Sequence, residues 1–208
     1  MCMANWYEKH VLPRLIDAAC GQPPMRALRS RYVSGASGRV LELGIGSGLN
    51  LAHYDQTQVD SVTGVDPAAE LTVKAAERAD KIDIPVEVLG ISGESLDLDD
   101  NSFDTLVCTW TLCSIPNPYR AVDEMRRVLK PGGQLIFVEH GRSDEAHIAK
   151  WQRRIEPLWK KIGGGCHLTR RVDDLLRDGG FKIDALETGY EDGPKVAAFM
   201  LHGVAQPR

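Results

Sequence analysis

Residues 39–50 read Arg39-Val-Leu-Glu-Leu-Gly-Ile-Gly-Ser-Gly-Leu-Asn50, and they are the most informative part of the sequence. The apolar run from Val40 to Leu43 predicts a short buried strand. Glycines then recur at alternate positions. Because glycine has no Cβ, such a run allows a sharp turn and a close approach of a ligand to the backbone. A dinucleotide-binding loop would carry its third glycine where Leu49 stands. The stretch therefore predicts a ligand loop of a different type.

A second apolar run, Ser61-Val-Thr-Gly-Val-Asp66-Pro67, ends in a carboxylate. It follows the first run by about 20 residues, the distance at which nucleotide-binding α/β folds place the acid that accepts the ribose hydroxyls. We therefore predict that Asp66 binds a ribose. Proline favours the first turn of a helix, so we expect a helix to start at Asp66-Pro67.

The composition is that of a globular chain of 208 residues with a net charge of −4. This length suits one domain, and the negative charge argues against a large nucleic-acid-binding surface. No apolar run reaches the roughly 20 residues of a membrane span, and the N-terminus does not read as a secretory signal. The five cysteines include no Cys-x-x-Cys pair. We therefore predict no disulfide framework and no metal site, and a cytoplasmic location.

From Arg39 onward, strand and helix patterns alternate, which predicts a mainly parallel sheet with helices on both faces. A helical stripe over 6–19 contains Pro13, so the helix either begins near Leu12 or kinks there. A second helix is expected over 25–32. Strands are expected at 40–43, 61–65, 86–89, 103–109, 134–139, 181–188 and 196–204, and further helices near 48–54, 67–80, 118–129, 146–162 and 169–177.

Two further phrases carry a family resemblance: Asn101-Ser-Phe-Asp104-Thr-Leu-Val107 and Glu124-Met-Arg-Arg-Val-Leu-Lys-Pro-Gly-Gly133. With the glycine loop, they resemble the class I S-adenosylmethionine (SAM) methyltransferases over about 39–141. The resemblance implies a Rossmann-like, seven-stranded, mostly parallel sheet whose last strand is antiparallel. It also implies SAM as the cofactor. We expect an N-terminal helical lid (1–38), a SAM-binding core (39–141) and acceptor-side helices and closing strands (142–208) in one domain.

The resemblance places the cofactor residue by residue. The loop glycines would pass the amino acid and ribose of SAM, Asp66 would take the ribose hydroxyls, and Gly93 with Glu94 would border the adenine. Ser92 stands where many relatives have an aspartate, so adenine recognition rests on the backbone or on Glu94. The expected cofactor contacts are Glu42, Gly44, Gly46, Gly48, Asn50, Asp66, Pro67, Gly93, Glu94, Thr109 and Leu112.

A narrower resemblance lies in the second half, in the segments around 107–114, 138–140 and 156–159 and in Gly165-Cys-His-Leu-Thr-Arg170. These segments resemble the microsomal alkyl-thiol S-methyltransferases, which implies a small-molecule thiol acceptor. Phospholipid N-methyltransferases and quinone C-methyltransferases share the core and remain alternatives, as does a SAM-binding protein without catalysis. The hydrophobic N-terminal anchor of the microsomal proteins is not found, so membrane-surface contact is not predicted.

A thiol acceptor reacts as its thiolate, and a free thiol has a pKa of about 8.5, so a nearby base or positive charge raises the reactive fraction. His140 follows the fifth strand, and histidine is the side chain whose ordinary pKa lies closest to neutral pH, which makes His140 the first candidate base. His167 is the second. His140 can instead be a histidine that caps or hydrogen-bonds the loop. His167 and Arg170 can orient or deprotonate the acceptor, and Cys166 can be a reactive thiol or a buried one. Tyr7 and His10 are assigned to a lid, and the expected acceptor contacts are Tyr7, Trp110, Cys113, Trp159 and Arg170.

Overall fold

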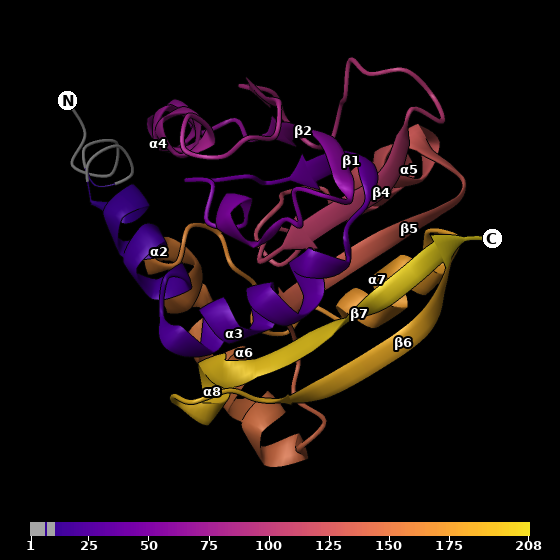
Figure 1. The fold of residues 1–208 in the computed structure, drawn as a ribbon. Helices are drawn as coiled ribbons and strands as arrows, with labels where there is room; N and C mark the ends of the chain where they lie inside the picture. Colours follow the sequence, from indigo (N-terminus) through magenta and orange to yellow (C-terminus); the bar gives the residue numbers. More distant parts are fainter. Residues whose placement is uncertain (1–6, 8–10) are drawn as a thin grey trace.

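The computed structural model describes Tyr7 and residues 11–208, and a seven-stranded sheet runs through it (Figure 1). The strand order is β3-β2-β1-β4-β5-β7-β6. The strands are β1 (Gly38–Leu43), β2 (Val59–Val65), β3 (Val86–Leu89), β4 (Phe103–Thr109), β5 (Leu129–His140), β6 (Phe181–Tyr190) and β7 (Phe199–Pro207).

The first five strands are parallel, and β7 lies antiparallel between β5 and β6. This confirms the predicted Rossmann-like sheet with an antiparallel last strand. The order reverses at β1, which has β2 on one side and β4 on the other. In open α/β sheets a ligand crevice forms at such a switch point, beyond the carboxyl ends of the strands. The glycine loop follows β1 and therefore lies at this point.

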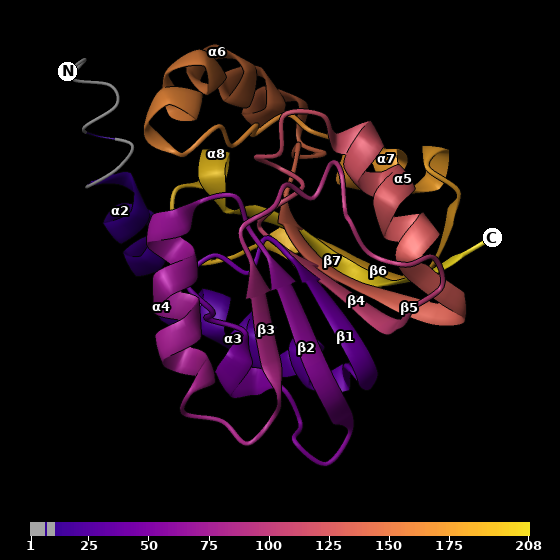
Figure 2. The same ribbon diagram turned by 90° about the horizontal axis from the view of Figure 1, so that it is seen from above.

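Helices cover both faces of the sheet (Figure 2). They are α2 (Leu12–Cys20), α3 (Pro23–Tyr32), α4 (Ala69–Ala79), α5 (Pro118–Val128), α6 (Ala146–Ile162), α7 (Val172–Asp178) and α8 (Lys195–Ala198), with 3₁₀ turns η1 (Val33–Gly35) and η2 (Leu51–His53). Alternate strand residues point to opposite faces. Thus Leu106 packs with α5 and α7, whereas its neighbour Val107 packs with η1 and α4.

The carboxyl edge of the sheet is covered by α2 and α6. In Figure 2, α6 lies beyond the arrowheads of β1 to β3. Leu12 and Ile16 of α2 approach Gly164, just after α6. Tyr7 links the same two regions, because its hydroxyl donates to the carbonyl of Ile162 at 3.1 Å. Among the described residues, every helix falls short of the length and apolarity that crossing a bilayer requires.

Most of the predicted elements are present. Their boundaries differ from the prediction where a proline or a glycine with positive φ sets the backbone conformation. Pro13 starts α2 rather than kinking it. The helix expected over 48–54 is wrong, because only the 3₁₀ turn at 51–53 forms. Gly48 has φ +79°, which an α-helix cannot accommodate. Pro67 is also not in the first turn of a helix: it precedes Ala68, the N-cap of α4.

Two strands begin elsewhere than expected. β5 begins at Leu129, not at 134, because Leu129 is buried opposite Phe103 and residues 130–133 bulge out of the ladder. Gly132, at φ +79°, makes that bulge possible. β7 begins at Phe199, where pairing with Tyr190 starts, and the residues before it form α8.

Candidate active site

Each of the three loop glycines is required for a different structural reason. All have positive φ: +73° at Gly44, +53° at Gly46 and +79° at Gly48. A Cβ on Gly44 would collide with the side chain of Thr111, and one on Gly48 would lie 3.0 Å from the Cα of Ala75. A Cβ on Gly46 would meet nothing closer than the Gly44 carbonyl oxygen at 3.9 Å. Gly46 therefore faces open space, where a ligand can approach the backbone.

Asp66 joins the end of β2 to this loop. Its Oδ2 accepts a hydrogen bond from the Gly46 amide at 3.1 Å, and its Oδ1 accepts one from the Ala68 amide at 2.8 Å. Burial raises the pKa of the Asp66 carboxyl, and the two amide bonds oppose that shift. The structure thus brings Asp66 and the glycine loop together, as the ribose assignment requires.

A buried polar network around Glu42, near the end of β1, supports the glycine loop. Glu42 is 1% exposed, and its carboxylate accepts from Asn50 Nδ2 at 2.9 Å and from the Tyr54 hydroxyl at 2.7 Å. Asn50 Nδ2 also donates to Thr109 Oγ1 at 3.0 Å, while Asn50 Oδ1 accepts from Arg29 Nε at 2.8 Å. Burial raises the pKa of Glu42 to about 7. Three residues predicted to touch the cofactor, Glu42, Asn50 and Thr109, therefore bond mainly to one another.

The segment expected to border the adenine follows β3. Gly93 packs tightly, since a Cβ there would lie 2.5 Å from Leu43 Cδ1. Glu94 Oε1 accepts from the Asn117 amide at 2.7 Å, so one carboxylate oxygen is used at the start of α5. Leu112 is fully buried in the core, and its amide is bound by Glu139. Its side chain therefore has no exposed surface to offer a cofactor.

Glu139 organises the loop after β4. It is fully buried near the end of β5, and its carboxylate accepts from the amides of Thr111 (2.9 Å), Leu112 (2.9 Å) and Cys113 (3.1 Å). Burial raises the pKa of Glu139 to about 6, and the three amide bonds counter that effect. The sequence analysis assigned Glu139 no role. A carboxylate inside an apolar strand nevertheless indicates that buried N–H groups nearby need an acceptor.

The segment Gly165–Arg170 is fastened to this same loop. The His167 amide donates to the Cys113 carbonyl at 2.8 Å. The Arg170 guanidinium donates to the carbonyls of Leu112 and Ile115, the latter at 2.9 Å. The imidazole of His167 lies by Glu156 of α6, with Nδ1 3.5 Å from Oε1, and burial lowers its pKa. Two predicted residues, His167 and Arg170, therefore position the loop.

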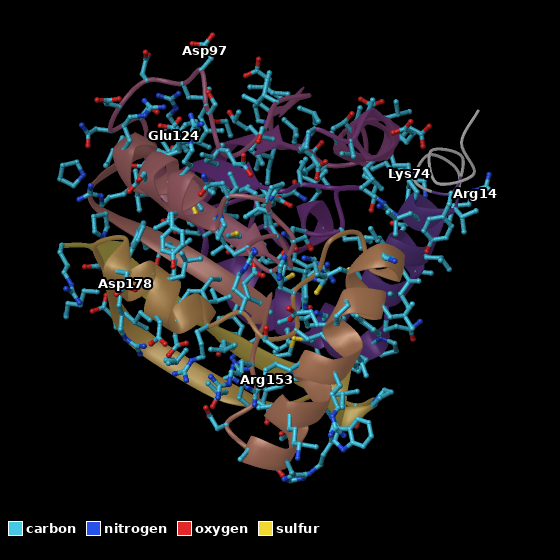
Figure 3. The ribbon with its side chains drawn as sticks, turned by 180° about the vertical axis from the view of Figure 1, so that it is seen from behind. Arg14, Lys74, Asp97, Glu124, Arg153 and Asp178 are labelled. Carbon is cyan, nitrogen blue, oxygen red and sulfur yellow. The ribbon has the colours of Figure 1, made fainter. Side chains whose placement is uncertain are left out.

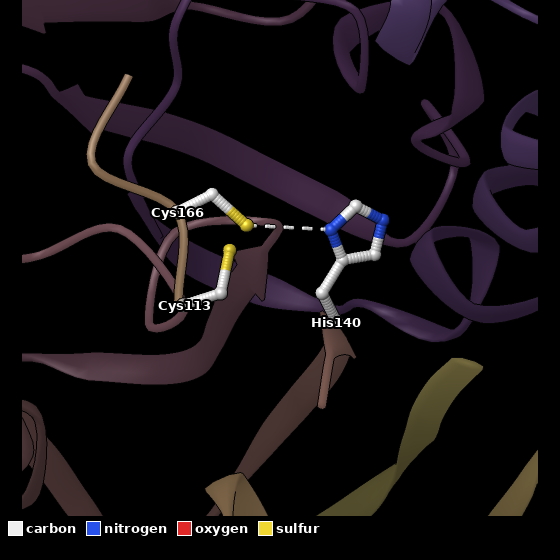
Figure 4. A group of neighbouring side chains, drawn as sticks. All are labelled: Cys113, His140 and Cys166. Carbon is white, nitrogen blue, oxygen red and sulfur yellow. Dashed lines mark hydrogen bonds between the residues drawn. The ribbon is translucent and has the colours of Figure 1, made fainter. Parts of the chain in front are cut away.

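The fastening brings Cys166 to Cys113 and His140 (Figure 4). Cys166 Sγ lies 3.5 Å from His140 Nδ1, and the ligand-type atoms of all three residues lie within 4.8 Å of one another. Both cysteines are buried, whereas His140 is half-buried. The neighbouring Cys113 thiol and His140 lower the pKa of Cys166, while contact with Cys166 and burial raise that of Cys113. One thiolate is therefore favoured between the two.

The aromatic residues assigned to the acceptor occupy separate places. Trp159 packs against Cys113 and Cys166, beside the cluster. Trp110 packs with α3 residues and Met200, and Arg29 stacks over its ring at 4.3 Å. His10, assigned to the lid, lies outside the described residues.

Asp17 connects α2 to the glycine loop and to α4. Ser47 Oγ donates to its Oδ1 at 2.5 Å, and Lys74 and Arg78 of α4 bind the same carboxylate at 3.2 Å each. Figure 3 shows Lys74 close to Arg14, which belongs to α2. Through this bond, Ser47 joins α2 to the predicted cofactor loop.

We expect Asp17→Ala to release α2, because one carboxylate carries all three contacts. A hydrogen bond to a charged group contributes about 1.5–3 kcal/mol, so proteolysis near Arg14 should be faster and SAM should dissociate sooner. Asp55→Ala is the control, since Asp55 bonds only within its own turn. Equal proteolysis of both variants would show that Asp17 does not hold α2 in place.

Comparisons with known proteins define the class. Residues 41–137 match the family described as methyltransferase domain. The chain is 41% identical over 162 residues to the human thiol S-methyltransferase TMT1B, covering 74% of this chain and 65% of that protein. It is 32% identical over 140 residues to phosphatidylethanolamine N-methyltransferase of Cereibacter sphaeroides, covering 66% and 68%. The chain belongs to the class I SAM-dependent methyltransferases.

A solved structure gives the same fold. The SAM-dependent methyltransferase of Thermotoga maritima, a possible histamine N-methyltransferase, superposes with a TM-score of 0.69 and 22% identity over 99% of both chains. Because the chain belongs to the SAM-dependent methyltransferases, its cofactor is SAM, as predicted. The chain spans less than two thirds of the length of the thiol methyltransferases TMT1B that it matches in rat and human.

Proposed function

We propose that this methyltransferase transfers the methyl group of SAM to the sulfur of a small-molecule thiol. SAM would lie over Gly46, with its ribose hydroxyls on Asp66 and its adenine along Gly93. A Cβ placed on Gly46 would meet open space, and the Gly46 amide is already bonded to Asp66. The methyl group would then point toward Cys113 in the loop after β4 and toward His140 at the end of β5.

The observation that carries the thiol proposal is the set of charged groups around the loop that carries Cys113. Glu139, the carboxylate that contacts the Cys113 loop, is fully buried and occupied by three amides, so it cannot hold an ammonium ion. Beside it lie the half-buried His140 and the Arg170 guanidinium, while the carboxylate of Glu156 accepts from Thr169 and contacts His167. Such surroundings favour an acceptor that becomes an anion, as a thiol does. The 41% identity to thiol S-methyltransferases supports the same reading.

The protein's part in the reaction is to place and deprotonate the acceptor. Nδ1 of His140 faces Cys166, which leaves Nε2 for the proton of the acceptor thiol. The thiolate lone pair then attacks the methyl carbon while the bond from that carbon to the sulfonium breaks, which gives a thioether and S-adenosylhomocysteine. SAM supplies the electrophile, and the chain supplies proximity and exclusion of water.

An acceptor screen tests the proposal. An alkyl thiol, an aryl thiol, phosphatidylethanolamine vesicles and a reduced quinone are each incubated with SAM, and S-adenosylhomocysteine release and product mass are measured. We expect turnover of the thiols. His140→Gln should lower that turnover by about 10²–10⁴-fold, the usual contribution of a general base. His147→Gln, at an exposed position on α6, is the control. Methylation of the amine or quinone alone would refute the thiol assignment.

Phospholipid N-methylation is the second candidate, because a bacterial phosphatidylethanolamine N-methyltransferase is 32% identical over two thirds of both chains. It predicts binding to anionic vesicles that weakens with salt. Thiol turnover without vesicle binding would exclude it.

Asp66→Ala tests the ribose assignment. We expect SAM affinity to fall by about 1–3 kcal/mol, because a charge-assisted hydrogen bond and the bond to Gly46 are both lost. Asp60→Ala, an exposed position on β2, is the control. The measurement is isothermal titration with S-adenosylhomocysteine, and equal affinity in both variants would show that the ribose lies elsewhere.

A further inference from the structure

Two thiols and an imidazole from three distant segments meet at one point (Figure 4). Cys113 follows β4, His140 ends β5 and Cys166 follows α6. Their sulfur and nitrogen atoms lie within 4.8 Å of one another. Cysteine sulfur and histidine nitrogen are the ligands that zinc and related soft divalent cations select. Zinc–ligand distances of about 2.0–2.3 Å place such atoms roughly 3.5 Å apart, so small side-chain movements would close the site.

The surrounding contacts hold these ligands in place. The amide of Cys113 is bound by Glu139 at 3.1 Å and its carbonyl by the His167 amide at 2.8 Å. The loop that carries Cys113 is also tied to Arg170. Trp159 packs against both cysteines, and its buried indole N–H has no hydrogen-bond partner among the described residues. An N–H donor beside a metal-bound thiolate is a typical outer-shell partner.

We propose that Cys113, His140 and Cys166 bind a zinc-class divalent cation, and that its fourth coordination position takes the sulfur of the acceptor thiol. Three protein ligands and one open position are typical of catalytic zinc sites. The open position falls on the crevice side, because both cysteines are buried and His140 is the partly exposed ligand. This assignment rests on the proposed thiol acceptor.

The cation changes how the acceptor proton leaves. On coordination, the acceptor S–H bond breaks, its proton passes to solvent and its sulfur lone pair binds the cation. That sulfur then attacks the methyl carbon of SAM, the carbon–sulfonium bond breaks, and the neutral thioether leaves the cation. No electron is gained or lost by the metal. His140 acts as a ligand in the loaded protein and as a base in the metal-free protein.

The test uses Co²⁺ as a spectroscopic probe, added to the reduced, metal-free protein under anaerobic conditions and without SAM. We expect one Co²⁺ per chain, with thiolate-to-cobalt charge-transfer absorption. Loss of outer-shell partners alone weakens metal binding about 10–100-fold, so Cys113→Ser, Cys166→Ser and His140→Ala should each weaken it by more than about 100-fold. Cys20→Ser is the control, because Cys20 is a cysteine outside the cluster. Circular dichroism checks that each variant folds.

A second titration separates this proposal from the proposed function. Adding an aryl thiol to the Co²⁺ protein should change the absorption as the sulfur enters the open position. No Co²⁺ binding, or binding that survives all three ligand substitutions, would overturn the metal site even if thiols are methylated. Co²⁺ binding with an unchanged spectrum on thiol addition would overturn the open position. Absence of thiol methylation, measured separately, would overturn the proposed function.

Discussion

Gly46→Leu is expected to abolish SAM binding and methyl transfer while the protein stays folded. Gly46 lies at φ +53°, and nothing but the Gly44 carbonyl oxygen comes within 4 Å of a Cβ placed there. A leucine side chain would therefore project into the space assigned to SAM rather than into the core. We expect affinity for S-adenosylhomocysteine to fall beyond detection in a calorimetric titration, with no turnover of any acceptor.

Gly132→Leu provides a matched control for backbone strain. Gly132 has φ +79° and no atom within 4 Å of an added Cβ, but it lies in the bulge of β5, away from the crevice. A left-handed conformation costs a non-glycine residue roughly 1–2 kcal/mol, so both variants should lose similar stability. Only Gly46→Leu should lose the cofactor. Affinity within about tenfold of the parent would mean that SAM does not pass this residue.

Glu139→Gln is expected to disorder the loop that carries Cys113. The carboxylate accepts three amides, and its Oε2 alone serves Cys113. The glutamine side chain has one acceptor oxygen, so its NH2 group would face the Cys113 amide. The Cys113 N–H would then have no acceptor. A buried unsatisfied donor costs about 1–3 kcal/mol. We expect the free energy of unfolding to fall by that amount in urea titrations, and turnover of the acceptor to fall more than affinity for SAM.

Glu124→Gln is the control, because Glu124 also accepts a backbone amide, that of Leu96 at 2.7 Å. It lies on α5, where Figure 3 shows it beside the surface loop that carries Asp97. Its substitution should affect stability but leave the ratio of acceptor turnover to SAM affinity unchanged. The same ratio in both variants would mean that Glu139 has no particular part in placing the acceptor loop.

Patterns within single segments predicted most of the fold. Buried strands such as β1 and β4 read as apolar runs, and their order along the chain predicted a parallel sheet because helices separate them. Errors arose where backbone conformation outweighed propensity. Gly48 at φ +79° stops a helix that the neighbouring residues favour, and Leu129 enters β5 ahead of a Pro-Gly-Gly bulge that reads as a turn.

The site was predictable to the extent that its residues follow strands. The glycine loop and Asp66 lie together because the carboxyl ends of parallel strands meet at one edge. The approach of Cys166 to Cys113 could not be predicted, since it depends on Arg170 and the His167 amide contacting a loop far away in the chain. Cysteine spacing predicted no metal site, and our metal proposal departs from that prediction because its ligands come from three segments.

A crystal structure of this protein with S-adenosylhomocysteine would test the proposed cofactor site most directly. We predict that the nucleoside lies over Gly46, with its ribose hydroxyls on Asp66 and its sulfur directed toward Cys113 and His140. A nucleoside bound elsewhere, or a ribose that does not contact Asp66, would contradict it.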